Sequence, residues 1–147
     1  MEGCPGCYRT RITNRMVEIL IKPVMKMIPL FRCRNMKEAI AFYTKILDFE
    51  LSEPGASPDD WVVLLVNGDA ELMLTSLEGD QKIGIATNVL VDNIDELFEK
   101  YKKRGLDTSH KEGSPVHQGP IDQTWGTREF YVTDNDGNTL RFCEANR

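Results

Sequence analysis

The chain of 147 residues contains the same order of strand, helix and turn patterns twice, and the two copies are offset by 58 residues. Identical residues recur, for example, at Asn35/Asn93, Glu38/Glu96, Tyr43/Tyr101 and Lys45/Lys103. The apolar positions and the order of the expected strands also match between the halves. A repeat of this kind restricts the possible folds strongly. It predicts an α+β protein made of two β-α-β-β-β modules, over residues 27–77 and 84–144.

Each half combines strand signals with one amphipathic helix. The expected strands are Met27–Cys33, Phe49–Glu53, Trp61–Val66 and Ala70–Ser76, then Gly84–Val91, Leu106–Lys111, Arg128–Asp134 and Asn138–Glu144. The helices are expected to begin after Asn35 and Asn93, because each has a Glu three residues later, as in a capping box. Gly105 suits the end of the second helix. Asn67-Gly68-Asp69 and Asn135-Asp136-Gly137 suit tight turns.

The first 25 residues differ from the rest of the chain. They lack clear periodicity and are predicted to be a leader or flexible extension of a domain formed by residues 26–147. Five basic and two acidic side chains give residues 1–26 a charge of +3, so the formal net charge of −5 leaves −8 on the remainder. The pair Cys4 and Cys7 is expected to have no function, because no thioredoxin-like context and no second cysteine pair accompany it.

Composition excludes several classes of protein. A net charge of −5 disfavours a nucleic-acid-binding domain, which normally has a basic face. No apolar run reaches the ~20 residues of a membrane-spanning helix. No secretory signal is recognisable, so the expected compartment is the cytoplasm and the cysteines are expected to be thiols. The two histidines, His110 and His117, are too few for a His-rich metal centre.

Strand alternation predicts one apolar sheet face that packs on the helices and one mixed face. The mixed face would carry Ile28, Leu30, Arg32, Glu71, Met73, Ala86, Asn88 and Arg141. An amphipathic surface with a few fixed charges suits a polar organic molecule. The same charges could instead be solvated or paired across strands.

The segment Glu112–Thr127 is the second candidate for function, since loops of this length are usually functional or mobile. Trp125 could stack on a ligand ring or anchor the loop in the core. His117 is expected to be an exposed loop residue rather than a catalytic base, because no Asp or Cys pattern accompanies it. Trp61 is expected to pack at the start of a strand.

Two segments carry a resemblance to a known family. Ile40–Leu47, and Phe130–Phe142 with its Asp-Asn-Asp-Gly-Asn turn, resemble the vicinal oxygen chelate superfamily over residues 27–145. This superfamily contains glyoxalase I, extradiol dioxygenases and bleomycin resistance proteins. The segments most similar to the bleomycin resistance branch are Gln123–Phe130, Leu140–Phe142 and Pro29-Leu30. The resemblance implies a curved mixed sheet with a concave cleft.

The resemblance also implies where a metal would bind. The family's metal enzymes place ligands on the first, fourth, fifth and eighth strands, and the matching positions here are Ile28, Met73, Ala86 and Arg141. None of these side chains ligates a divalent metal well. We therefore expect no metal and no other cofactor.

The sequence and the resemblance together predict a non-enzymatic protein that binds a small molecule, such as a bleomycin-type antibiotic, in a cleft of a homodimer. The predicted ligand-binding residues are Arg32, Glu71, Met73, Asn88, His117, Trp125, Arg128 and Arg141. The charge of −8 favours a cationic drug by long-range attraction. Arg32 and Arg141 favour an anionic or carbonyl-bearing ligand instead.

Three alternatives stay open at this point. The first is a lyase or dioxygenase with atypical metal ligands. The second is a metal-free enzyme acting on a small carbonyl compound, in which Glu71 or Glu129 is the general base beside Arg141. The third is a protein-association module whose mixed sheet face is an obligate interface.

Overall fold

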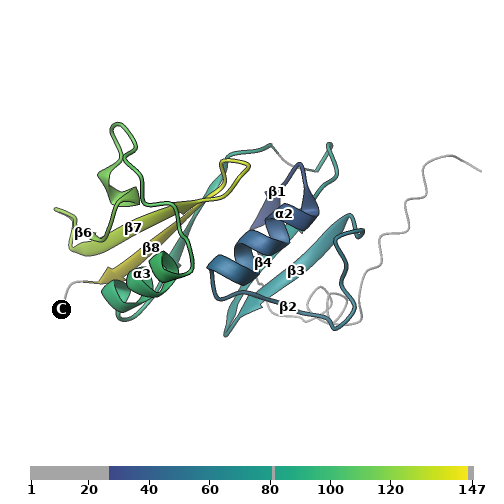
Figure 1. Cartoon of the computed structure of the whole chain (residues 1–147), viewed down its shortest axis with the longest axis horizontal. Helices are drawn as coiled ribbons and strands as arrows, with labels where there is room; N and C mark the ends of the chain where they lie inside the picture. Colours follow the sequence, from purple (N-terminus) through teal and green to yellow (C-terminus); the bar gives the residue numbers. More distant parts are fainter. Residues whose placement is uncertain (1–26, 81, 146–147) are drawn as a thin grey trace, which may run out of the picture.

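The computed structural model describes residues 27–80 and 82–145 and shows two modules side by side (Figure 1). The first contains β1 (Leu30–Arg32), α2 (Met36–Ala41), the π-helix η1 (Phe42–Ile46), β2 (Glu50–Leu51), β3 (Val62–Asn67) and β4 (Ala70–Thr75). The second contains β5 (Ala86–Leu90), α3 (Ile94–Lys103), the 3-10 helix η2 (Pro115–His117), β6 (Ile121–Asp122), β7 (Thr127–Thr133) and β8 (Thr139–Ala145). The duplicated β-α-β-β-β order is confirmed.

Each module has its own four-stranded mixed sheet. The first sheet has the order β1-β4-β3-β2 and the second has the order β5-β8-β7-β6. In both sheets the strand before the helix runs parallel to the last strand of its module, and the other pairs are antiparallel. The corresponding strands of the two modules therefore occupy corresponding places.

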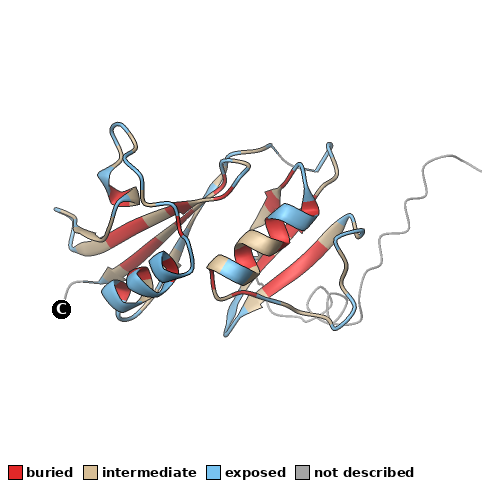
Figure 2. Ribbon diagram, viewed as in Figure 1, coloured by how far each residue is buried: buried red, intermediate tan, exposed pale blue. Residues whose placement is uncertain are grey.

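One hydrophobic core joins the two modules. Its buried side chains include Phe31 and Tyr43 of the first module and Tyr101, Phe130 and Phe142 of the second. Burial alternates along much of the strands, although Val63, Leu64 and Leu65 of β3 are buried in succession, and the helices bury their inner sides (Figure 2). The expected apolar face is thus the helix-covered side of each sheet, and we call the opposite side the open face.

The two α-helices begin by different means. At α2 the side chain of Asn35 accepts a hydrogen bond from the backbone N–H of Glu38 at 3.1 Å, as predicted. The same prediction is wrong at α3. Asn93 adopts a left-handed conformation with φ of 55° and makes no side-chain cap. Instead the Glu144 carboxylate of β8 accepts from the backbone N–H groups of Asn93 and Ile94 at 3.3 and 2.9 Å.

The expected strand Leu106–Lys111 is also wrong. Leu106 is buried, and its backbone N–H donates a hydrogen bond to the Tyr101 carbonyl at 3.1 Å, at the end of α3. The carboxylate of Asp107 then accepts from the Ser109 N–H at 2.9 Å. Such a local turn competes with extended backbone. The predicted loop Glu112–Thr127 contains η2 and β6, so its irregular stretches are shorter than expected.

The turn between β7 and β8 ties the modules together. The carboxylate of Asp134 accepts a hydrogen bond from the hydroxyl of Tyr43, in the first module, at 2.8 Å. The fully buried Asn138 donates to the Arg32 carbonyl at 2.9 Å and accepts from the N–H groups of Gly84 and Ile85. The Asp-Asn-Asp-Gly-Asn motif thus has a structural role.

Candidate functional site

The open face of the second sheet carries a connected group of polar and charged side chains. Strand pairing places Asn88 of β5 opposite Arg141 of β8, and Arg141 opposite Tyr131 of β7. Glu129 and Thr133 flank Tyr131 on the same side of β7, because side chains alternate along a strand. We call this surface, with the neighbouring Trp125 and His117, the second open face.

Glu129 is the centre of this surface and is only 3% exposed. Its Oε1 accepts hydrogen bonds from the Trp125 indole N–H at 2.9 Å and the Thr127 hydroxyl at 2.6 Å. Its Oε2 accepts from the Tyr131 hydroxyl at 2.9 Å and lies 3.5 Å from Nη2 of Arg141. Burial alone would raise the pKa of Glu129, but these donors and the Arg141 charge outweigh burial and lower it.

Arg141 lies on the ring of Tyr131. Its Cζ is 4.7 Å from the ring centroid, and its Nη2 donates to the Tyr131 hydroxyl at 2.5 Å. Its Nε is buried and has no hydrogen-bond partner among the described residues. A ligand could not reach this buried Nε without moving the side chain. The accessible part of Arg141 is therefore the outer part of a guanidinium already engaged by Tyr131 and Glu129.

Trp125 projects from the turn between β6 and β7. The backbone N–H of Gln123 donates a hydrogen bond to the Thr127 carbonyl at 2.7 Å, which closes this turn. Gly126 supplies the positive φ of 91° that the turn needs. The Trp125 side chain is 63% exposed although its N–H is bound to Glu129. The indole is thus held in place with much of its surface free.

His117 attaches η2 to the other edge of the second open face. Its Nε2 lies 2.9 Å from the Thr133 hydroxyl and its Nδ1 lies 2.8 Å from the Ser114 hydroxyl. Its ring meets the Tyr131 ring edge-on, with 5.8 Å between centroids. Burial, and then the charge of Lys111, lower the pKa of His117. The imidazole is therefore neutral at pH 7, and it is bound rather than free in the loop.

The first sheet carries a sparser open face. Met73 lies in register with Leu30 on one side and Leu64 on the other. Arg32 is 3.9 Å from Glu78 through its Nη2, and its Nε is buried without a hydrogen-bond partner among the described residues. This face contains three of the predicted ligand-binding residues, Arg32, Glu71 and Met73.

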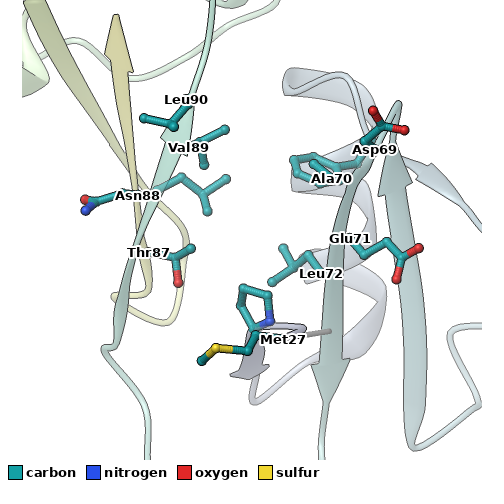
Figure 3. A pocket seen from close by; sticks show the side chains of 12 residues that line it. Met27, Asp69, Ala70, Glu71, Leu72, Thr87, Asn88, Val89 and Leu90 are labelled. Carbon is teal, nitrogen blue, oxygen red and sulfur yellow. The ribbon is translucent and has the colours of Figure 1, made fainter. Parts of the chain in front are cut away.

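The two open faces point away from each other. A pocket of about 310 Å³ lies between β4 and β5, lined by Met27, Pro29, Phe49, Asp69, Ala70, Glu71, Leu72, Thr87, Asn88, Val89, Leu90 and Leu140. Figure 3 shows Leu72 and Val89 pointing into the pocket from its two sides, while the polar ends of Glu71 and Asn88 point away in opposite directions. One chain therefore does not bring the two predicted groups of residues together.

The structure thus divides the predicted ligand-binding set. It places Asn88, His117, Trp125 and Arg141 together on the second open face. Arg128 lies on the opposite side of β7, where its guanidinium pairs with Asp95 at 2.7 Å and Asp122 at 3.2 Å.

Sequence reasoning missed Tyr131 and considered Glu129 only as a base. Alternation along β7 was the available signal, since it separates Glu129, Tyr131 and Thr133 from the buried Phe130 and Val132. The pairing of Trp125 with Glu129 had no comparable signal, because it depends on the geometry of the β6–β7 turn.

The positions implied for a metal do not fit one. Met73 has apolar neighbours on both adjacent strands, and Arg141 is a permanent cation bound to Tyr131 and Glu129. Neither is a donor that a divalent ion prefers. Within residues 27–80 and 82–145, no group of three or more His, Cys, Asp or Glu side chains could hold a metal ion. The same ranges contain no helix long and apolar enough to cross a membrane.

A fold of two β-α-β-β-β modules with polar open sheet faces defines a class of proteins. Residues 21–142 match the model of the Glyoxalase/Bleomycin resistance protein/Dioxygenase superfamily, and the chain belongs to this superfamily. No curated protein matches the chain.

Solved structures share the fold at low sequence identity. A bleomycin-binding protein in complex with bleomycin is 21% identical, with a TM-score of 0.65 over 82% of this chain and 98% of that one. A bleomycin resistance determinant encoded on transposon Tn5 is 20% identical, with a TM-score of 0.65 over 83% and 98%. A glyoxalase-related enzyme from Clostridium phytofermentans is 20% identical, with a TM-score of 0.62 over 84% and 97%. The fold is therefore common to binding proteins and enzymes.

Proposed function

We propose that this protein binds a small organic molecule on the second open face without transforming it. The observation that carries the proposal is the role of Glu129, whose buried carboxylate holds Trp125, Tyr131 and Arg141 in fixed positions. A largely exposed indole that is fixed by a hydrogen bond loses little conformational entropy when a ring stacks on it. Asn88 and His117 belong to this surface, whereas Arg128 does not.

The state of Glu129 favours binding over catalysis. A general base works best when its pKa lies near the working pH and its oxygens are open to the substrate. Both oxygens of Glu129 already accept hydrogen bonds, and its pKa is lowered. The alternative, an enzyme acting on a small carbonyl compound, would require Arg141 and Glu129 to separate first. Turnover of a 2-oxoaldehyde or a 2-oxo acid would support that alternative.

A bleomycin-type antibiotic is the ligand we propose. A structural neighbour with the same fold binds bleomycin. The residues from position 27 onward carry a formal charge of −8, which attracts a cationic molecule from a distance. Trp125 suits the flat heteroaromatic part of such a molecule, because an indole stacks well on aromatic rings.

We also propose that two copies of the chain form the cleft. The open faces of one chain point apart, so Arg32, Glu71 and Met73 could face the second open face only if they came from another copy. This proposal predicts a mass near twice 16.7 kDa in sedimentation equilibrium. A monomer at binding concentrations would contradict it.

Isothermal titration of metal-free bleomycin into the full chain tests the binding function. We expect saturable binding near one drug per chain, weakened at least about tenfold by Trp125→Ala through loss of stacking. Trp61→Ala is the matched control, because Trp61 is 46% exposed at the start of β3 in the other module. Equal loss in both variants, or no heat with the wild-type protein at high micromolar drug, would contradict the proposal.

A further inference from the structure

On the three long strands of the second open face, two side chains carry charge. Along the open-face positions of β5, β7 and β8, Glu129 and Arg141 are the charged residues. Cys143, opposite Glu129, has a raised pKa, chiefly because of burial and the Glu129 charge, so its thiol is neutral. His117 at the edge is neutral at pH 7 because its pKa is lowered.

Glu129 cancels the charge of Arg141. Its Oε2 lies 3.5 Å from the guanidinium, and at 3% exposure it cannot turn toward water. Two opposite charges at this distance interact strongly where water is partly excluded. An anionic ligand approaching Arg141 would therefore meet a nearly neutral pair and a fixed carboxylate behind it.

Glu129 also occupies the hydrogen-bond donors that an anion would need. The indole N–H of Trp125, the hydroxyl of Thr127 and the hydroxyl of Tyr131 all donate to it. Trp125 consequently offers a ligand its ring surface and not its N–H group. The surface that remains around Arg141 is aromatic, and the charge of Arg141 is compensated there by Glu129.

We propose that the second open face accepts a flat aromatic ring system that is uncharged or cationic, and that Glu129 is the residue that excludes anionic rings. The inference rests on the proposed binding function and specifies its ligand class. It also decides between the two charge signals in the sequence. Arg141 does not mark an anion site, because its charge is compensated inside the same surface.

Three naphthalene probes with the same ring and different charges test this specificity. They are naphthalene sulfonate, naphthalene methanol and naphthyl methylammonium, each titrated by calorimetry into the full chain. We expect the wild-type protein to bind the neutral and cationic probes at least about tenfold tighter than the sulfonate. Wild-type preference for the sulfonate would overturn the inference.

Two variants should move the preference in opposite directions. Glu129→Gln keeps the size of the side chain and one oxygen for Trp125 and Thr127, but it uncovers the charge of Arg141. It should tighten sulfonate binding about tenfold. Arg141→Gln leaves the carboxylate uncompensated, so it should weaken sulfonate binding further and tighten binding of the ammonium probe.

Asp122→Asn is the matched control for net charge. It removes one negative charge from the same module, but Asp122 pairs with Arg128 on the other side of β7. It should leave all three affinities unchanged. Circular dichroism should show that each variant is folded. An unchanged sulfonate affinity in folded Glu129→Gln, or an equal gain in Asp122→Asn, would overturn the inference.

The probes and bleomycin also separate two kinds of failure. If bleomycin binds and none of the naphthalene probes does, the ligand class inferred here is wrong while the binding function stands. If neither bleomycin nor any probe binds, the proposed function fails and the inference fails with it.

Discussion

Tyr43 and Asp134 come from different modules, and their side chains meet inside the protein. The Tyr43 ring is 1% exposed and its hydroxyl donates to Oδ2 of Asp134 at 2.8 Å. Burial first, and then the Asp134 charge and hydrogen bond, raise the pKa of Tyr43 well above its ordinary value of 10.0. Tyr43 therefore stays protonated in the folded protein at pH values where an exposed tyrosine ionises.

Tyr43→Phe should lower stability and also change how stability depends on pH. Removing the hydroxyl should cost about 1 to 2 kcal/mol, because Asp134 loses one buried donor. A group whose folded pKa is raised contributes its full stability below the unfolded pKa and loses it as pH rises. Above pH 10 the unfolded tyrosine ionises first, so stability falls by about 1.4 kcal/mol per pH unit for this group.

Urea unfolding from pH 8 to pH 11.5 measures both effects. The free energy of unfolding of the variant should be lower at pH 8, and it should fall less steeply above pH 10, than that of the wild-type protein. Other groups with raised pKa values, such as Tyr101, keep part of the slope in both proteins. Identical slopes would show that Tyr43 ionises normally in the folded state.

At the scale of single elements, α3 is the clearest case in which a local pattern and the structure disagree. The sequence pairs Asn93 with Glu96 as in the first helix, yet Asn93 is left-handed and does not cap. Glu144, which is 50 residues from Ile94 in the sequence, supplies the carboxylate at the helix N-terminus. An anion at this end of a helix satisfies free N–H groups and interacts favourably with the helix dipole.

Glu144→Ala should therefore destabilise the protein by about 1 kcal/mol, in the range typical of a lost N-cap. Glu96→Ala is the matched control, since Glu96 is exposed and should change stability by less than about 0.5 kcal/mol. Urea unfolding at pH 7 measures both. A larger loss in Glu96→Ala than in Glu144→Ala would restore the capping box that the sequence suggested.

These elements also show what the sequence could predict. Periodicity and the repeat predicted the two modules, their helices, most strands and which strand faces are apolar, since each depends on neighbouring residues. The cap of α3 was missed, and the strand expected at Leu106–Lys111 is absent. Glu144 acts across the sheet, and Asp107 forms a local turn that outweighs weak strand signals.

The candidate site was predicted in part for the same reason. Alternation placed Asn88 and Arg141 on one face, and the loop signals singled out His117 and Trp125. The organising role of Glu129 depends on which residues of β7 and β8 stand opposite each other and on the turn that carries Trp125. Register and turn geometry arise only when the sheet assembles, so one sequence gives no direct signal for them.

At the scale of the whole molecule, several contacts join the modules besides the core. Asp48 of the first module pairs with Lys100 and Arg104 near the end of α3, both at 2.6 Å. These side chains are partly exposed, so each pair contributes less than about 1 kcal/mol. The buried link from Asn138 to the Arg32 carbonyl and the shared core contribute more, because neither can be lost without exposing apolar or polar groups.

The two modules should therefore unfold together, and the chain contains natural reporters for this prediction. Its two tryptophans, Trp61 and Trp125, lie one in each module. Trp61→Phe leaves a reporter in the second module, and Trp125→Phe leaves one in the first. In each variant the fluorescence midpoint in urea should coincide with the midpoint from far-ultraviolet circular dichroism, which averages over both modules.

The buried link between the modules makes this prediction sharper. Asn138→Ala removes the bond to Arg32 and leaves the N–H groups of Gly84 and Ile85 without their acceptor. It should cost about 3 kcal/mol or more, since several buried hydrogen bonds are lost at once. Because one core spans both modules, it should lower the two tryptophan midpoints equally. A shift confined to Trp125 would show that the second module unfolds alone, and that the duplicated halves are joined more weakly than their common core indicates.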